Sequence, residues 1–201
     1  MEIIVHRVNS IKMLKKIPIN FGVEIDLRAY KSKIILNHEP FKSGDSLDNF
    51  LKYYNHGTLI LNIKEDGIED EVIKKVNKAK IKSFFLLDVE FPYIFKCLKN
   101  NQKNIAIRFS EKEPIDISKL FEKKLKWLWI DTVSKLPLNK KNLKVIKKFK
   151  SCLVCPERWG RPNEINKYKQ QMKNLKFKPD AVMTSLKYAY SWLEWFTFKI
   201  W

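Results

Sequence analysis

Cysteine is scarce in this sequence: Cys97, Cys152 and Cys155 are the three cysteines among 201 residues. A small, odd number of cysteines excludes a regular disulfide framework and indicates a reducing compartment. Cys152 and Cys155 form a Cys-x-x-Cys pattern, but residues three apart in a strand face opposite sides, so their sulfur atoms would diverge. Because no second pair completes a zinc site, we interpret both as ordinary strand cysteines.

Long hydrophobic runs are also missing. No stretch approaches the roughly 20 apolar residues of a membrane-spanning helix. The opening letters MEIIVHRV do not show a basic segment followed by an apolar run, which is the pattern of a signal peptide. We therefore expect a cytoplasmic protein.

Arginine is rare although the chain is strongly basic, with a formal net charge of +18 and 40 Lys and Arg residues. Five of these residues are arginines, the side chain that reads base edges and grips phosphates with two parallel hydrogen bonds. The lysines alternate with apolar positions in predicted helices, as on solvated helix faces. We therefore favour a solvated basic surface, and nucleic-acid binding is the less favoured alternative.

Short β-branched or aromatic runs alternate with amphipathic helical patterns along the chain. Near-continuous apolar strands followed by such helices are typical of a parallel sheet covered by helices. No linker or change of composition interrupts the alternation, so we expect a single domain over residues 1–201. The predicted strands cover residues 2–8, 22–28, 58–64, 83–89, 104–110, 126–133, 151–157 and 180–186.

Eight strand-plus-helix units predict an α/β fold, a compact (β/α)8 TIM barrel, smaller than the usual ~250 residues of that fold. The alternative is an open doubly wound sheet, which needs a glycine-rich phosphate turn after the first strand. The chain has only five glycines, and HRVNS stands where that turn would be. We therefore predict the barrel.

Polar residues follow nearly every predicted strand. In a barrel of this kind the chemistry takes place at the C-terminal ends of the strands, so these residues are expected to converge on one mouth. The strand ends carry His6 and Arg7, Glu24 and Asp26, Asn62 and Lys64, Asp88 and Glu90, Arg108 and Ser110, Asp131, Glu157 and Arg158, and Thr184 and Ser185.

Two histidines and two acids stand out in this set. His56 precedes the third strand, at the opposite end of the barrel, and we interpret it as structural. His6 and His38 are then the candidates for proton transfer. Glu24 and Asp26 are two apart and point to one face, and paired carboxylates suit Mg²⁺ or Ca²⁺, hard cations that prefer oxygen ligands. Basic side chains beside such a cation predict an anion site, best matched by a phosphoryl group.

Four short segments carry a resemblance to a known family. IVHRV, GVEIDLR, IILNHEP and LILNIK occur in this order between residues 3 and 64. They resemble the glycerophosphodiester phosphodiesterase family, within the PI-PLC-like phosphodiesterase superfamily of barrels. The family's pattern is His-Arg, Glu-x-Asp, a His-Asp pair about a dozen residues on, and Glu-x-Lys. The resemblance in architecture extends over the whole chain.

The resemblance implies a barrel that cleaves phosphodiesters with the help of a divalent cation, Mg²⁺ or Ca²⁺. In this family a substrate hydroxyl or water attacks the phosphorus while one histidine accepts a proton and the other donates one. The implied roles are cation binding for Glu24, Asp26 and Asn62, acid–base catalysis for His6 and His38, and phosphate binding for Lys64 and for Arg7, which is also a candidate catalytic residue.

The sequence departs from the family's pattern in its loops and in one cation ligand. Val8 replaces a glycine, the loop after it is short, and Glu39 stands for the aspartate of the His-Asp pair. Asn62 occupies the position of the family's third acidic ligand. An amide oxygen can bind Mg²⁺ or Ca²⁺ but adds no charge, so weaker cation binding is expected unless another strand-end acid compensates.

Two aromatic features remain. Trp159 and Arg161 follow the seventh strand, and we predict that they contact substrate by stacking or by gripping an anionic group. Residues 188–201 contain Trp192, Trp195 and Trp201, which we interpret as part of the eighth helix and its extension. Attachment to a membrane surface through these aromatic residues is the less favoured alternative.

We therefore predict a hydrolase that acts on a small-molecule phosphodiester, for example a lipid headgroup fragment. Two other classes stay open. One is a catalytically degenerate barrel that binds a phosphorylated ligand without turnover, for which Asn62 is the main argument. The other is a binder of anionic surfaces or nucleic acid, which predicts a steep dependence of binding on salt. The sequence carries no signal for an oligomeric state.

Overall fold

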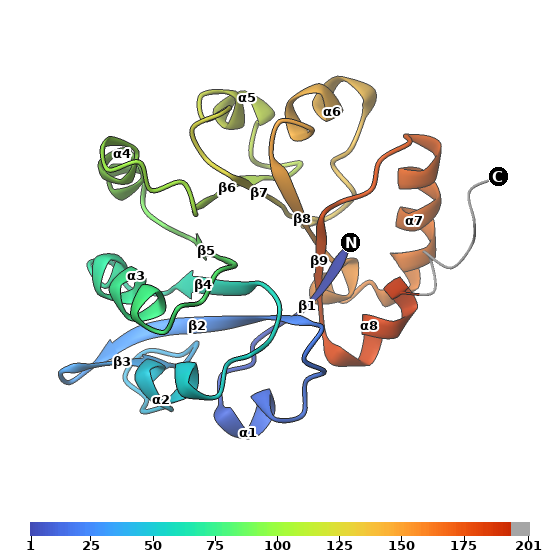
Figure 1. Cartoon of the computed structure of the whole chain (residues 1–201). Helices are drawn as coiled ribbons and strands as arrows, with labels where there is room; N and C mark the ends of the chain where they lie inside the picture. Colours follow the sequence, from blue (N-terminus) through green and yellow to red (C-terminus); the bar gives the residue numbers. More distant parts are fainter. Residues whose placement is uncertain (194–201) are drawn as a thin grey trace. The chain divides into compact units, whose positions relative to one another are not determined.

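The structure is a computed structural model that describes residues 1–193. The chain forms two compact units. The N-terminal unit is Ile4–Asn100, and the C-terminal unit combines Met1–Ile3 with Asn101–Trp201. In Figure 1 the N-terminal unit runs from blue to green and the C-terminal unit from green to red.

The N-terminal unit contains four parallel strands in the order β1-β2-β4-β5, with β3 paired antiparallel to β2. Strand β4 is buried along its whole length, as expected for a parallel strand covered on both faces. The elements are β1 (Glu2–Val5), α1 (Ile11–Leu14), β2 (Gly22–Tyr30), β3 (Lys33–Leu36), α2 (Leu47–Lys52), β4 (Leu59–Ile63), α3 (Glu69–Lys78), β5 (Phe84–Leu87) and α4 (Phe91–Lys99).

The β2–β3 hairpin differs from the predicted arrangement. The second strand continues two residues beyond the predicted end at residue 28, turns at Lys31 with φ 55°, and returns as β3. The Asn37 N–H then donates to the Asp26 carbonyl at 3.0 Å. The hairpin thus returns the chain that follows β3, including His38, to the polar end of β2.

The C-terminal unit contains the parallel strands β6, β7, β8 and β9, each hydrogen-bonded to the next. Strand β1 begins in this unit, where the Glu2 N–H donates to the Asp180 carbonyl at 2.7 Å. The elements are β6 (Ala106–Phe109), α5 (Ile115–Lys119), β7 (Trp127–Ile130), α6 (Lys140–Ile146), β8 (Lys150–Val154), the 3₁₀ turns Pro156–Trp159 and Pro162–Glu164, α7 (Ile165–Asn174), β9 (Ala181–Thr184) and α8 (Leu186–Leu193).

Polar side chains mark the starts of several helices. Ser10, Ser46 and Asn139 each accept a hydrogen bond from a backbone N–H in the first turn of α1, α2 and α6. Such caps satisfy donors that a helix start leaves unpaired.

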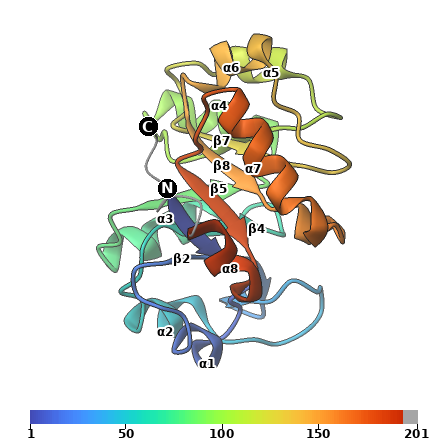
Figure 2. The same cartoon turned by 90° about the vertical axis from the view of Figure 1, so that its right-hand side faces the viewer.

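Two helices of the C-terminal unit, α5 and α6, lie side by side in both views (Figures 1 and 2).

Eight parallel strands alternate with helices in residues 1–193, which is the arrangement of a compact (β/α)8 TIM barrel. The predicted fold class is confirmed. The interpretation of residues 1–201 as a single domain stays a prediction. Within the described residues, no helix is both long and apolar enough to cross a membrane.

Candidate phosphodiester site

Strand β2 presents charged side chains at alternate positions along its length. Glu24 and Asp26 are both 0% exposed, and Arg28 is the next residue on the same face. In the neighbouring strand β4, Asn62 is the register partner of Asp26. Because both carboxylates are excluded from water, each acid requires polar partners inside the N-terminal unit.

The Glu24 carboxylate has partners on both oxygens. The Arg7 backbone N–H donates to Oε2 at 2.7 Å, and Asn62 Nδ2 donates to Oε1 at 2.8 Å. His6 Nε2 lies 3.8 Å from the same Oε2. Arg7 has φ 55°, a left-handed conformation that is uncommon outside glycine. The end of β1 is thus folded around Glu24.

The Asp26 carboxylate is held mainly by Asn9. Asn9 Nδ2 donates to Asp26 Oδ2 at 2.8 Å, and the Asp26 N–H donates back to Asn9 Oδ1 at 2.8 Å. Two cations flank the acid: Lys64 Nζ lies 3.7 Å from Oδ1, and Arg7 Nε lies 3.9 Å from Oδ2. Lys64 Nζ also donates to Asp88 Oδ2 at 3.1 Å. Asp26 and Asp88 therefore share the charge of one lysine.

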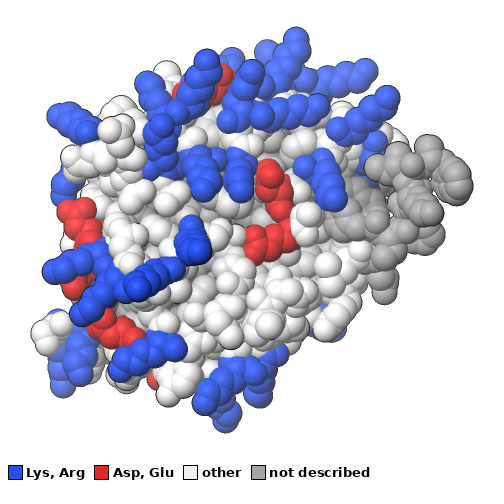
Figure 3. Space-filling view, in the orientation of Figure 1, with Lys and Arg blue, Asp and Glu red and all other residues white. Residues whose placement is uncertain are grey.

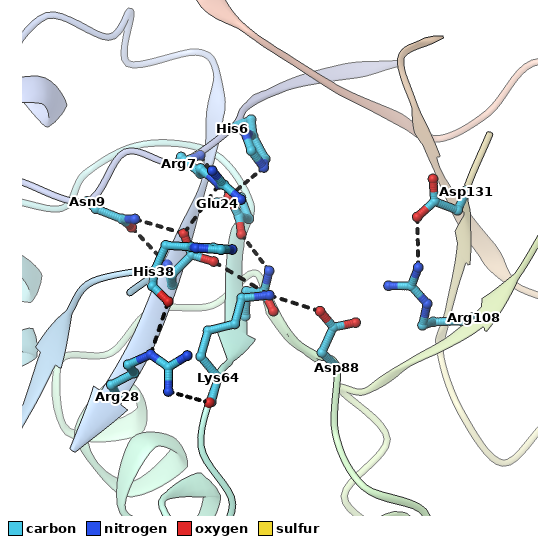
Figure 4. A network of polar contacts seen from close by, with 12 residues as sticks. His6, Arg7, Asn9, Glu24, Arg28, His38, Lys64, Asp88, Arg108 and Asp131 are labelled. Atoms are coloured by element: carbon cyan, nitrogen blue, oxygen red, sulfur yellow. Dashed lines mark hydrogen bonds and ion pairs between the residues drawn. The ribbon is translucent and has the colours of Figure 1, made fainter. Parts of the chain in front are cut away.

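His38 is oriented by the residue that follows it. His38 Nδ1 lies 2.8 Å from Glu39 Oε1, and an ionised carboxylate can only accept a hydrogen bond. Glu39 therefore fixes the hydrogen on Nδ1 and leaves Nε2 with a lone pair in the neutral ring. Figure 4 shows the His38 ring directed toward the side chains around Glu24.

Arg28 connects the segments that carry two of these candidate residues. Its Nε donates to the His38 carbonyl at 3.0 Å, and its Nη1 donates to the Lys64 carbonyl at 2.8 Å (Figure 4). One guanidinium thus fixes the segment after β3 against the segment after β4. This role suits arginine, whose planar fork presents several donors in a rigid geometry.

The proximity of the two buried acids alters their chemistry. Burial, and then the negative charge of Asp26, raise the pKa of the Glu24 carboxyl to about 7. The hydrogen bonds from Arg7 and Asn62 and the charge of Lys64 act in the opposite direction. A positive charge placed beside both carboxylates would favour their ionised forms and relieve their repulsion.

A divalent cation fits this group of oxygens. Asp26 Oδ1 and Asn62 Oδ1 are buried and have no hydrogen-bond partner among the described residues. Together with Glu24 they offer carboxylate and amide oxygens, the ligands that Mg²⁺ and Ca²⁺ prefer. Residues 1–193 contain no cluster of three or more His, Cys, Asp or Glu side chains arranged to hold a metal, because the third ligand in this group is an amide.

The structure brings most of the predicted site residues together in the N-terminal unit. Sequence reasoning missed two residues that hold them. Arg28 could have been found, because it continues the alternation of Glu24 and Asp26 on one face of β2. Asn9 lies in the loop after β1, where no periodic pattern singles it out. The residues brought together are His6, Arg7, Glu24, Asp26, Asn62 and Lys64, with His38 joined to them through Arg28.

Trp159 and Arg161, the other two predicted site residues, belong to the C-terminal unit. Trp159 is 45% exposed, and its Nε1 donates to Asp131 Oδ1 at 2.7 Å. The Arg161 guanidinium donates to the carbonyls of Thr132 and Val133 at 2.6 and 2.8 Å. The Arg161 guanidinium is thus engaged by backbone carbonyls of its own unit. Contact of Trp159 and Arg161 with substrate stays a prediction.

The aromatic segment at the end of the chain is described in part. Trp192 is fully buried in α8, and its Nε1 donates to Cys155 Sγ at 3.3 Å. This position agrees with the interpretation of residues 188–193 as a helix of the barrel. Trp195 and Trp201 lie outside the described residues. All three cysteines are free thiols and are buried.

Comparison with solved structures supports the architecture. A protein from Agrobacterium tumefaciens, assigned as a glycerophosphoryl diester phosphodiesterase, superposes with a TM-score of 0.67 over 96% of each chain at 8% identity. A glycerophosphoryl diester phosphodiesterase from Parabacteroides distasonis gives 0.63 over 90% of this chain and 81% of its own, at 12% identity. The chain has the fold of these phosphodiesterases. No protein-family model matches the sequence, and no curated protein is significantly similar to it.

The raised pKa of Glu24 predicts a pH-dependent stability of the cation-free protein. Because the folded state holds this proton more tightly than the unfolded chain, the contribution is complete below about pH 4.5 and is lost as pH rises through about 7. The shift corresponds to roughly 3 kcal/mol. Glu24→Gln, which cannot ionise, removes this contribution. Urea unfolding in the presence of a chelator measures the free energy of unfolding of wild type and of Glu24→Gln at several pH values. The difference between the two proteins should change by that amount between pH 4.5 and pH values above 7. Stability curves that run parallel with pH would contradict the assignment.

Proposed function

We propose that this chain is a phosphodiester hydrolase of the glycerophosphodiester phosphodiesterase type that depends on a divalent cation. The observation that carries the proposal is the buried pair Glu24 and Asp26, surrounded by His6, Arg7 and Lys64. Two buried acids with histidine and basic side chains around them are suited to bind a cation and an anionic substrate together. The names of the two structural neighbours are consistent with this reaction.

Mg²⁺ or Ca²⁺ would be held by Glu24, Asp26 and Asn62. When bound, the cation would supply positive charge to the phosphoryl oxygens of the substrate and so favour attack at phosphorus. Lys64 and the partly exposed Arg7 side chain, which both lie beside Asp26, would bind further phosphoryl oxygens in this proposal. Because Asn62 brings no charge, the site carries less negative charge than one with three acids and should hold its cation more weakly.

His38 acts as the general base in this proposal and His6 as the general acid. A water molecule or a neighbouring substrate hydroxyl gives its proton to His38 Nε2 as its oxygen bonds to phosphorus. The bond from phosphorus to the leaving alcohol breaks, and the leaving oxygen takes a proton from protonated His6. Glu39 orients His38. The Glu24 carboxylate lies 3.8 Å from His6 Nε2.

The alternative function is binding of a phosphorylated ligand without turnover. Asn62 favours it, because its amide Nδ2 donates to Glu24 in place of a third acidic ligand. Trp159 and Arg161 are candidate contacts for the alcohol groups of the ligand in either function.

Hydrolysis of bis(para-nitrophenyl) phosphate and of glycerophosphodiesters separates the two functions. We expect turnover that requires Mg²⁺, Ca²⁺ or Mn²⁺ and falls at least about 100-fold in Asp26→Asn and in His38→Asn. Asp116→Asn changes an exposed acid of α5 and should keep wild-type activity. Folded protein that binds a phosphate ester but gives no turnover with any of these cations would contradict the hydrolase and support the alternative.

Asn62→Glu should strengthen cation binding. A third carboxylate adds charge to the site, so the affinity for Mg²⁺ or Mn²⁺ in calorimetric titration should rise about 10- to 100-fold. Without a cation the same variant should be less stable than wild type, because three buried acids repel one another. Asn62→Gln, which keeps the amide, is the matched control. An unchanged or lower affinity in Asn62→Glu would rule out Asn62 as a ligand position.

Arg28→Ala should lower kcat with a smaller effect on KM. The variant loses both hydrogen bonds that hold the His38 and Lys64 segments, and small displacements of catalytic groups cost about 10- to 100-fold in rate. Guanidinium added in solution should restore part of the rate, which a purely structural defect would not allow. Wild-type kcat in folded Arg28→Ala, measured beside circular dichroism, would show that Arg28 does not position the site.

A further inference from the structure

The strand starts of the C-terminal unit carry a concentration of lysine. The turns that lead into β6, β7, β8 and β9 and the first residues of these strands contain nine exposed lysines and no arginine. Glu122 and Asp180 are the acidic residues in the same places, and Glu2 is the first residue of β1. We call this the strand-start lysine surface: Lys103, Lys123, Lys124, Lys126, Lys147, Lys148, Lys150, Lys176 and Lys178.

Backbone hydrogen bonds show that part of this surface is one continuous row. The Lys126 N–H donates to the Lys103 carbonyl at 3.0 Å, and the Lys150 N–H donates to the Lys126 carbonyl at 2.9 Å. Neighbouring strands are about 4.8 Å apart, so three ammonium groups start from adjacent chain positions. Like charges in such positions destabilise a sheet. Among the described residues, no ion pair with an acidic side chain neutralises these three lysines.

Few acidic residues lie close to the row, because the turns and strand starts that carry the nine lysines contain only Glu122 and Asp180 as acids. Asp180 Oδ2 already accepts hydrogen bonds from the backbone N–H and the hydroxyl of Ser151. In Figure 3, basic side chains crowd the surface over α5 and α6, with few acidic ones between them.

Favourable contacts with helix ends explain only part of this charge. Lysines in the last turn of a helix are stabilised by the helix dipole, and Lys147 and Lys176 lie just beyond α6 and α7. Lys126, however, lies at the start of a strand, where no helix dipole stabilises it. Lys150 also begins a strand, and its Nζ lies 5.7 Å from the centroid of the Trp127 ring, a contact that leaves its charge unneutralised. An anionic partner would account for their position.

The chemistry of the surface favours a membrane over nucleic acid. Arginine, the side chain that grips single phosphates with two hydrogen bonds, is absent from these turns and strand starts. Lysine is a hydrated point charge that suits the diffuse field of anionic lipids. Leu120 directly follows α5 and is 62% exposed, three residues before Lys123. An exposed leucine among lysines can enter the lipid headgroup region, whereas a nucleic-acid backbone offers it no apolar contact.

We propose that the strand-start lysine surface binds the C-terminal unit to anionic lipid membranes. The interaction is electrostatic and reversible, with Leu120 as an apolar contact. This proposal does not depend on the proposed hydrolysis, since none of its residues belongs to the site around Glu24.

Cosedimentation with lipid vesicles tests the proposal on the full chain. Vesicles of equal parts phosphatidylcholine and phosphatidylglycerol should bind the protein at low salt and release it at high salt, and pure phosphatidylcholine should not bind it. The triple variant Lys103→Gln, Lys126→Gln and Lys148→Gln should bind about 100-fold more weakly, at roughly fivefold per lysine. Leu120→Ala should weaken binding by a smaller factor.

The control variant lowers the net charge of the protein by the same three units, but in the N-terminal unit. Lys12→Gln, Lys16→Gln and Lys33→Gln remove three exposed lysines from the N-terminal unit and should reduce binding only slightly. Equal losses in both triple variants would show that net charge alone drives binding, and no binding at low salt would also overturn the proposal. Tighter binding to double-stranded DNA than to vesicles would reassign the surface to nucleic acid. Hydrolysis of a soluble diester should be unchanged in both triple variants, which separates this test from that of the proposed function.

Discussion

The burial of Glu24 and Asp26 on one face of β2 is the constraint on which the site depends. Two acids that close repel each other, and their exclusion from water adds a further cost. The chain offsets this cost with the Arg7 N–H, the Asn9 and Asn62 amides and the charge of Lys64. These partners come from the ends of β1 and β4 and the loop after β1, so satisfying the acids gathers the candidate catalytic residues around them.

Asn62 gives this site its particular character. The Asn62 amide nitrogen donates a hydrogen bond to Glu24. The amide oxygen can bind a cation, but it carries no net charge, whereas a carboxylate at this position would add a full negative charge. Asp26 Oδ1 and Asn62 Oδ1 are buried and have no hydrogen-bond partner among the described residues. Both oxygens are therefore candidates to bind a cation. Compared with a carboxylate at position 62, the Asn62 amide should lower the affinity of the site for a cation. It should also make the cation-free protein more stable, because fewer buried acids repel one another.

Much of this arrangement follows from periodicity. Eight apolar strands that alternate with amphipathic helices predict the (β/α)8 fold, and the spacing of Glu24 and Asp26 predicts that they share a face. The hairpin of β2 and β3 was not predicted, because KIIL follows the turn at Lys31 without a glycine or Asn-Gly signal. The same hairpin positions His38, and the Arg28 side chain holds this segment by donating a hydrogen bond to the His38 carbonyl. Contacts of that kind depend on tertiary geometry, which a sequence pattern does not encode.

Diffraction from crystals of the protein soaked in Mn²⁺ tests directly whether Glu24, Asp26 and Asn62 bind a cation. An anomalous peak is expected in contact with oxygens of Glu24, Asp26 and Asn62, and this peak should be lost in Asp26→Asn. The absence of a peak from a wild-type crystal at high Mn²⁺, with Asn62 still bonded to Glu24, would contradict the cation site and the mechanism built on it.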